Sequence, residues 1–106
     1  MEQTDAITAF AALAQPTRLD AFRLLVKAGP DGMAAGEIAD ALGARQNTMS
    51  ANLSVLHAAG LVESRREGRS IRYFAAMGRV GALVDFLVED CCGGRPDLCP
   101  PMGDCA

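Results

Sequence analysis

The four cysteines of the chain all fall within its last sixteen residues. Cys91 and Cys92 are adjacent, and Cys99 follows them after a segment that contains two glycines and a proline. Thiolates are soft ligands, and a set of three sulfurs without histidine suits trivalent arsenic or antimony, which bind trigonally with a lone pair. Adjacent side chains diverge by about 100° on a helix, so both thiols can face one ion only if a helix ends there, as Gly93 permits. The spacing favours a soft-ion site made by Cys91, Cys92 and Cys99.

Other uses of the same cysteines stay open from the residues alone. Zinc prefers four ligands, and Cys105 could complete a tetrahedral four-sulfur site. Recruiting Cys105 closes a longer loop, but doubling a loop costs only about 0.6 kcal/mol, which does not exclude an exchange with Cys99. Cadmium or lead binding, thiol oxidation and an inert tail are further alternatives.

A second set of residues has the chemistry to bind DNA. Polar side chains cluster on the early part of an expected helix, at Gln46, Asn47, Thr48, Ser50 and Asn52. Glutamine and asparagine offer a paired donor and acceptor to adenine, whereas serine and threonine hydroxyls can bind phosphates or base edges. This pattern predicts a helix that reads the major groove, and its alternative is a structural or protein-binding module.

Basic charge is concentrated just after that helix, although the net charge of the chain is −3. Residues 61–79 hold five arginines against two glutamates. Four of them belong to an expected hairpin and are predicted to straddle DNA phosphates, at Arg65, Arg66, Arg69 and Arg72. Arg69, at the turn, is best placed to enter a minor groove. The alternative is a solvated, charged face.

Apolar spacing predicts the elements that position these residues. Helices are expected from a cap at Thr4 or Asp5 to residue 14, and over residues 16–27, 35–42, 46–58 and 78–90. The third and fourth are separated by three residues, which is typical of a helix-turn-helix. Alternating residues from 61 to 74, with a Gly68-Arg69 turn, predict a β-hairpin. The expected fold is mainly α with a small hairpin wing.

Length and composition indicate one small domain followed by a tail. The chain has 106 residues, half of them apolar, which suggests a domain over residues 1–90 and a cysteine-rich tail over residues 91–106. It has no apolar run of about 18 residues, and its acidic start lacks the basic region of a signal peptide. We therefore expect a cytoplasmic protein with no membrane partner, and dimerisation would stabilise a domain of this size.

Several motifs in order resemble the ArsR-type (ArsR/SmtB) family of winged helix-turn-helix metalloregulatory repressors. They are Leu13-Ala-Gln-Pro-Thr-Arg-Leu19, Glu37-Ile-Ala-Asp-Ala-Leu-Gly43, Asn47-Thr-Met-Ser-Ala-Asn-Leu53, Leu56-His-Ala-Ala-Gly-Leu-Val62 and Glu67-Gly-Arg-Ser-Ile-Arg-Tyr73. The resemblance implies a homodimer paired through its first and last helices, which here carry Phe10, Leu13, Leu83, Phe86 and Leu87. Such a dimer would bind an inverted-repeat operator with half-sites roughly 34 to 36 Å apart.

Arsenic-responsive members of that family carry similar C-terminal cysteine pairs. The resemblance therefore implies a repressor without a constitutive cofactor that As(III) or Sb(III) releases from its operator through Cys91, Cys92 and Cys99. A divalent soft metal (zinc, cadmium or lead) or thiol oxidation at the same cysteines is the alternative. A thiol-dependent reductase is not expected, because Glu89, Asp90 and the helix end beside Cys91 disfavour an activated thiolate. A metal-storage protein is a further alternative, and it would leave no footprint on DNA.

Overall fold

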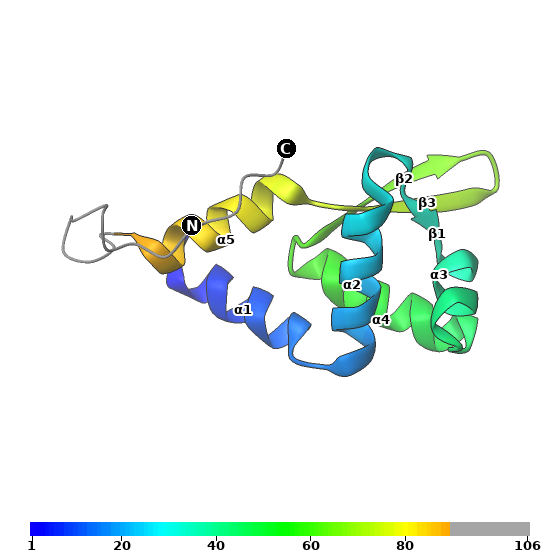
Figure 1. Ribbon diagram of the computed structural model, residues 1–106, viewed down its shortest axis with the longest axis horizontal. Helices are drawn as coiled ribbons and strands as arrows, with labels where there is room; N and C mark the ends of the chain where they lie inside the picture. Colours follow the sequence, from blue (N-terminus) through cyan, green and yellow to red (C-terminus); the bar gives the residue numbers. More distant parts are fainter. Residues whose placement is uncertain (90–106) are drawn as a thin grey trace.

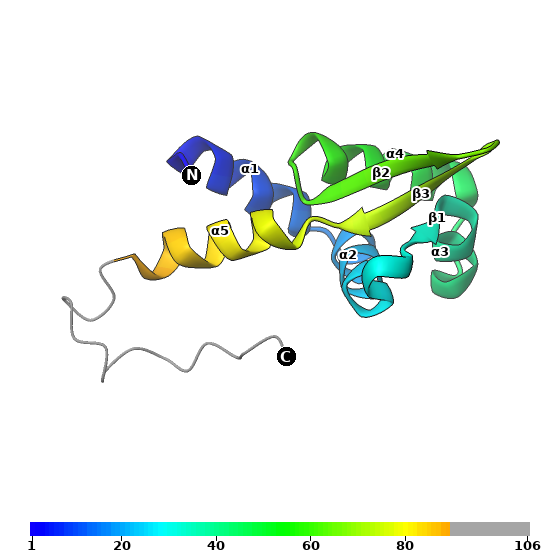
Figure 2. The same ribbon diagram turned by 90° about the horizontal axis from the view of Figure 1, so that it is seen from above.

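The computed structural model describes residues 1–89, which form a helical body with a three-stranded sheet. In chain order the elements are α1 (Gln3–Leu13), α2 (Pro16–Ala28), the short 3-10 helix η1 (Gly29–Asp31), β1 (Met33–Ala34), α3 (Ala35–Leu42), α4 (Gln46–Ala58), β2 (Val62–Glu67), β3 (Ser70–Ala75) and α5 (Met77–Val88). Helices α2, α3 and α4 pack together, the β2–β3 hairpin projects at one end, and α1 and α5 extend at the other (Figures 1 and 2). The predicted mainly α fold with a hairpin wing is confirmed.

Local signals set most helix boundaries where the sequence predicts them. Pro16 begins α2, and the side chain of Gln15 accepts a hydrogen bond from the Arg18 backbone N–H. Gly43 ends α3 in the left-handed conformation, with φ +65°, where glycine carries no Cβ penalty. The predicted cap of α1 at Thr4 or Asp5 is wrong, because the helix begins at Gln3. The Asp5 carboxylate instead accepts a hydrogen bond from the Glu2 backbone N–H, at 3.4 Å.

The sheet has the strand order β1-β3-β2, with both pairs antiparallel. The hairpin pairs Val62 with Ala75 and Glu67 with Ser70 around the predicted turn. Strand β1, which the sequence analysis did not predict, pairs Met33 with Tyr73. This short strand fastens the wing to the segment that leads directly into α3, so the wing and the helix-turn-helix form one unit.

The core lies where α2, α3 and α4 meet, and its largest fully buried side chains are Leu25, Ile38, Met49, Leu53, Leu56 and Leu61. Burying an apolar side chain of this size contributes about 1.5 to 3 kcal/mol. Because Met49, Leu53 and Leu56 form one stripe of α4, they fix which face of that helix turns to solvent.

Helix α5 contributes little to this core, since Leu83 is its one buried residue. An ion pair between Arg79 and Asp5, at 3.7 Å, links α5 to α1. The helix ends at Val88, two residues before the predicted end. Within residues 1–89, no helix is long and apolar enough to cross a membrane.

Candidate nucleic-acid interface

The start of α4 presents a polar surface. Gln46, Asn47, Thr48 and Ser50 are all exposed, while Met49 between them is fully buried. Burial of that one stripe holds the helix in a fixed rotation, so the polar residues of its first turns face solvent together. This is the part of a recognition helix that contacts base edges in the major groove.

A groove separates the start of α4 from the hairpin. It is lined by Gln46 and Ser50 of α4, by residues 34–36 at the start of α3, and by residues 69–71 and Tyr73 of the hairpin. A Cβ placed on Gly36 would lie 3.8 Å from Cδ of Gln46, so the glutamine side chain rests against the first turn of α3. The fold thus brings two predicted DNA-binding segments, the helix start and Arg69, to the walls of one groove.

The register of the hairpin separates its arginines by face. Arg66 pairs with Ile71, and Arg65 pairs with Arg72. Because successive side chains of a strand point to opposite faces, Arg66 shares the face of Ile71 and Tyr73, which line the groove. Arg65 lies on the opposite face, with its guanidinium carbon 4.7 Å from the centroid of the Phe74 ring. The predicted arginines therefore do not form one continuous phosphate-binding surface.

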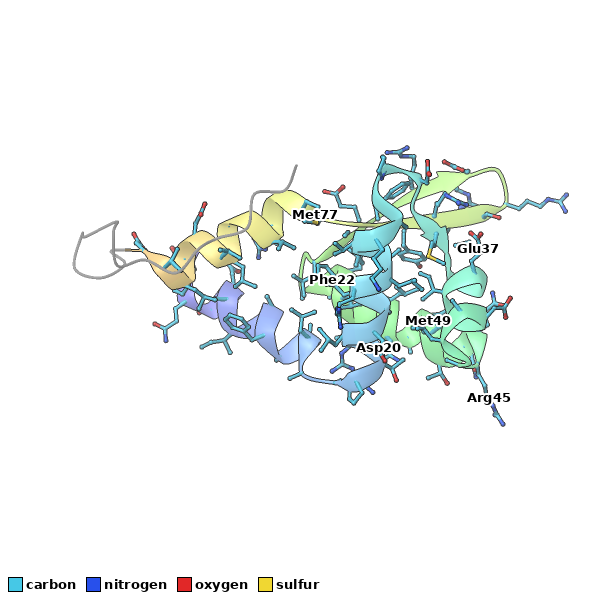
Figure 3. The ribbon with its side chains drawn as sticks, viewed as in Figure 1. Asp20, Phe22, Glu37, Arg45, Met49 and Met77 are labelled. Atoms are coloured by element: carbon cyan, nitrogen blue, oxygen red, sulfur yellow. The ribbon has the colours of Figure 1, made fainter. Side chains whose placement is uncertain are left out.

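Arg72 is bound within its own chain. Its Nε donates to the carbonyl oxygen of Asp31 at 2.6 Å, its Nη2 donates to that of Gly32 at 3.4 Å, and its Nη1 lies 3.3 Å from Oε1 of Glu37. Glu37 lies in the first turn of α3, on the side of the sheet (Figure 3). The geometry argues against the phosphate contact predicted for Arg72, because its guanidinium is bound to Glu37 and to the turn before β1, where it fastens the wing to the helix-turn-helix.

Asn52 also has a partner within the chain. It is half-buried, and its side-chain oxygen accepts a hydrogen bond from Nη1 of Arg18, a residue of α2, at 3.3 Å. The sequence pattern predicts Asn52 among the exposed base-reading residues. In the structure it lies on the flank of α4 that faces α2.

Arg45 belongs to this surface, although the sequence analysis did not single it out. It is the residue before α4, it is exposed, and its side chain extends outward from the start of the helix (Figure 3). A guanidinium beside the positive end of a helix is well placed to contact a phosphate. The signal was visible in the sequence as a basic residue directly before the polar run.

The predicted soft-ion ligands Cys91, Cys92 and Cys99, and the alternative ligand Cys105, lie outside the described residues. Within residues 1–89 there is no cluster of three histidine, cysteine, aspartate or glutamate side chains that could hold a metal ion.

Comparison with protein families identifies the helix-turn-helix. A family model described as "Helix-turn-helix domain" matches residues 13–65. The biofilm growth-associated repressor of Agrobacterium fabrum is 34% identical over 86 residues, which cover 81% of this chain and 71% of that repressor.

Solved structures share this fold over most of the chain. An ArsR-like transcriptional regulator from Rhodococcus sp. RHA1 superimposes with a TM-score of 0.71 and 31% identity, covering 79% of this chain and 76% of that one. The homodimeric winged helix-turn-helix DNA-binding domain of Mb0332 from Mycobacterium bovis, a possible ArsR-family regulator, gives a TM-score of 0.66 and 34% identity. That match covers 88% of this chain and 86% of the relative.

Proposed function

Because this chain belongs to the ArsR family of winged helix-turn-helix transcriptional regulators, we propose that it is a homodimeric repressor whose inducer is trivalent arsenic or antimony. DNA-binding repression follows from family membership. The arrangement of the DNA surface, the dimer and the inducer site are our proposals. The observation that carries the DNA surface is the groove between α4 and the wing, because it collects polar and basic side chains from two distant segments.

The position of each proposed DNA-binding side chain relative to this groove indicates whether it would contact bases or phosphates. Gln46, Asn47, Thr48 and Ser50 enter the major groove, where amides and hydroxyls bind base edges and nearby phosphates. Arg69 enters the adjacent minor groove from the wing tip, and Arg45 and Arg66 contact phosphates beside it. Arg65, on the opposite face of the hairpin, contacts a phosphate only away from the protein groove. Arg72 is left out because its guanidinium is bound to α3 and to the turn before β1.

Exposed apolar side chains on α1 and α5 support a dimer formed through these helices. Ile7 and Leu87 are each 58% exposed and Phe10 is 41% exposed, which is costly for side chains of this size in water. Leu83, in contrast, is buried within its own chain and is not available to a partner. The Mycobacterium bovis relative is homodimeric. A two-fold dimer of this kind would bind an inverted repeat.

The inducer is proposed from donor chemistry. Cys91, Cys92 and Cys99 supply three thiolates without a histidine, which suits As(III) or Sb(III). A fourth thiol at Cys105 keeps zinc as the alternative ion.

Contacts at the start of α5 connect this helix to the end of α4 and to the start of the wing. The backbone N–H of Ala76 donates to the carbonyl oxygen of Leu61 at 2.9 Å. The Arg79 side chain lies against Gly60, just beyond the end of α4, since a Cβ there would be 3.2 Å from Nε of Arg79. A displacement of α5 on ligand binding would therefore reach α4 and the wing. A tenfold to thousandfold loss of operator affinity requires a coupling of about 1.4 to 4 kcal/mol.

Two single substitutions test the DNA surface, with a duplex that the unmodified protein selects from a randomised library as the probe. We expect Asn47→Ala to lose about 1 to 3 kcal/mol of preference for the selected duplex over a scrambled one, because a base-edge contact is removed. We expect Arg69→Ala to weaken binding to both duplexes alike and to lower the slope of log affinity against log salt by about one, because one phosphate contact is removed.

Lys27→Ala provides the charge-matched control, since Lys27 is exposed in the last turn of α2 and does not line the groove. Fluorescence anisotropy across a range of salt concentrations measures all four proteins. If Asn47→Ala and Arg69→Ala both bind as Lys27→Ala does, the proposed DNA surface is wrong.

A further inference from the structure

Arg18 occupies the corner where α1, α2 and α4 meet. Its Nε donates to the carbonyl oxygen of Ala12, in the last turn of α1, at 2.6 Å. Its Nη1 donates to Oδ1 of Asn52 on α4 at 3.3 Å. The half-buried guanidinium is thus held by the end of one helix while it holds a side chain of the recognition helix.

This contact fixes which way the Asn52 amide is turned. A guanidinium carries hydrogen-bond donors and no acceptor, so the atom of Asn52 that faces Arg18 must be its oxygen. Among residues 1–89 the Asn52 amide nitrogen makes no hydrogen bond. It is also not one of the fully buried polar atoms that lack a partner, so it retains access to solvent. The oxygen is therefore engaged inside the chain, and the NH₂ group is the end of Asn52 that is open to solvent.

An asparagine held in this way is less suited to read adenine than a free asparagine, because its amide cannot turn freely toward the base. Bidentate recognition of adenine needs the amide oxygen to accept from N6 while the amide nitrogen donates to N7. The Asn52 oxygen keeps a second lone pair, but its hydrogen bond to Arg18 holds it toward α2 and leaves the NH₂ group as the end that can meet DNA. The expected ligand of this NH₂ group on DNA is an acceptor atom, which is a phosphate oxygen or a base acceptor such as N7 of a purine or O6 of guanine.

We propose that Arg18 is a positioning residue that orients Asn52 so that its NH₂ group meets an acceptor atom of DNA. The proposal rests on the proposed function, because it assumes that α4 is the reading helix. Asn52 lies one turn behind Thr48 on the flank of α4 that faces α2, away from the groove that Gln46 and Ser50 line. Side chains set back from the start of a recognition helix lie near the groove edge, where phosphates pass.

A double-mutant cycle on DNA affinity tests the coupling between the two residues. Arg18→Met, Asn52→Ala and the double variant are measured on the duplex selected by the unmodified protein and on a scrambled duplex. Since a neutral hydrogen bond is worth about 0.5 to 1.5 kcal/mol, we expect Asn52→Ala to weaken binding about 2- to 13-fold. We expect Arg18→Met to weaken it by a similar factor and the double variant to lose no more than Arg18→Met alone.

Three further variants separate positioning from loss of charge or fold. Arg18→Lys keeps a donor and should restore most of the affinity. Arg23→Met removes one positive charge from an exposed site on the same helix and should not reproduce the effect of Arg18→Met at moderate salt. Asn52→Asp keeps an acceptor for Arg18 but turns a carboxylate toward DNA, so it should bind more weakly than Asn52→Ala, and most clearly at low salt. Circular dichroism confirms that each variant is folded.

The outcomes distinguish the ligand and the hypothesis. Equal losses by Asn52→Ala on both duplexes identify a phosphate contact, and a loss confined to the selected duplex at a guanine or thymine identifies a base acceptor. Loss of a preference for adenine over guanine, which requires the amide oxygen to accept from N6, overturns the inference, as do additive effects of Arg18→Met and Asn52→Ala. If the unmodified protein selects no duplex at all, the proposed function fails, and this inference fails with it.

Discussion

Replacing Cys91 and Cys92 together by serine is expected to leave the protein on its operator at arsenite concentrations that release the unmodified chain. A hydroxyl is a hard, weakly acidic donor and cannot replace a thiolate toward As(III), so only one strong ligand of the proposed three remains. The arsenite-dependent loss of affinity, tenfold to thousandfold in the unmodified protein, should fall to less than about twofold. Anisotropy of a labelled operator duplex under reducing conditions measures this directly.

The controls for this result come from the same chain. Without arsenite, the double-serine protein should bind DNA as the parent does, because the changed residues lie outside α4 and the wing. Cys105→Ser should keep most of the response. Release of the double-serine protein at the parent's arsenite concentration would show that the inducer site is elsewhere.

Substituting Gly32 by alanine is expected to cause the largest loss of stability, because this glycine meets two obstacles at once. Its backbone lies at φ 62° and ψ −172°, a region essentially reserved for glycine, and holding another residue there costs about 1 to 3 kcal/mol. A Cβ would also lie 2.5 Å from the Tyr73 carbonyl oxygen and 2.6 Å from the Phe74 ring. We expect the free energy of unfolding to fall by about 3 kcal/mol or more, a large share of the typical 5 to 15 kcal/mol.

The same substitution should weaken DNA binding through the wing, because β3 must shift to accommodate the methyl group. Gly43→Ala is the matched control: Gly43 also has a positive φ, of 65°, but a Cβ there meets nothing within 4 Å. Gly43→Ala should lower the free energy of unfolding by only about 1 to 2 kcal/mol. It should leave unchanged the part of the DNA affinity that the wing contributes. Chemical denaturation of both variants gives the comparison, and equal losses would contradict the close packing of Gly32 against β3.

Elements with local signals were predictable from the sequence. Helices α2, α3 and α4 have clear apolar stripes and end near glycines, and the hairpin combines alternation with a Gly68-Arg69 turn, so their bounds agree closely with the structure. Strand β1 was not predictable in this way, because two residues carry no periodic pattern. It exists through its pairing with β3, from Met33 to Tyr73, which is a contact between distant parts of the chain.

The candidate site was predicted in composition but not in its internal contacts. Residue type and position place Gln46, Asn47 and Arg69 on an accessible surface, and the structure agrees. The pattern gave no sign that Arg72 binds Glu37 or that Arg18 binds Asn52, because these partners are 35 and 34 residues apart and meet only when the chain folds. Both arginines are engaged in contacts within the chain, and we propose that these contacts position other parts of the DNA surface.

The central claim is that trivalent arsenic releases this repressor from DNA, and one titration tests it most directly. The unmodified protein is bound to its selected, labelled duplex, and arsenite, zinc, cadmium or peroxide is added in separate series while anisotropy is recorded. We expect arsenite to lower DNA affinity by a factor of about ten to a thousand, and at lower concentration than any other addition. Release by zinc, cadmium or peroxide while arsenite leaves the anisotropy unchanged would contradict the claim.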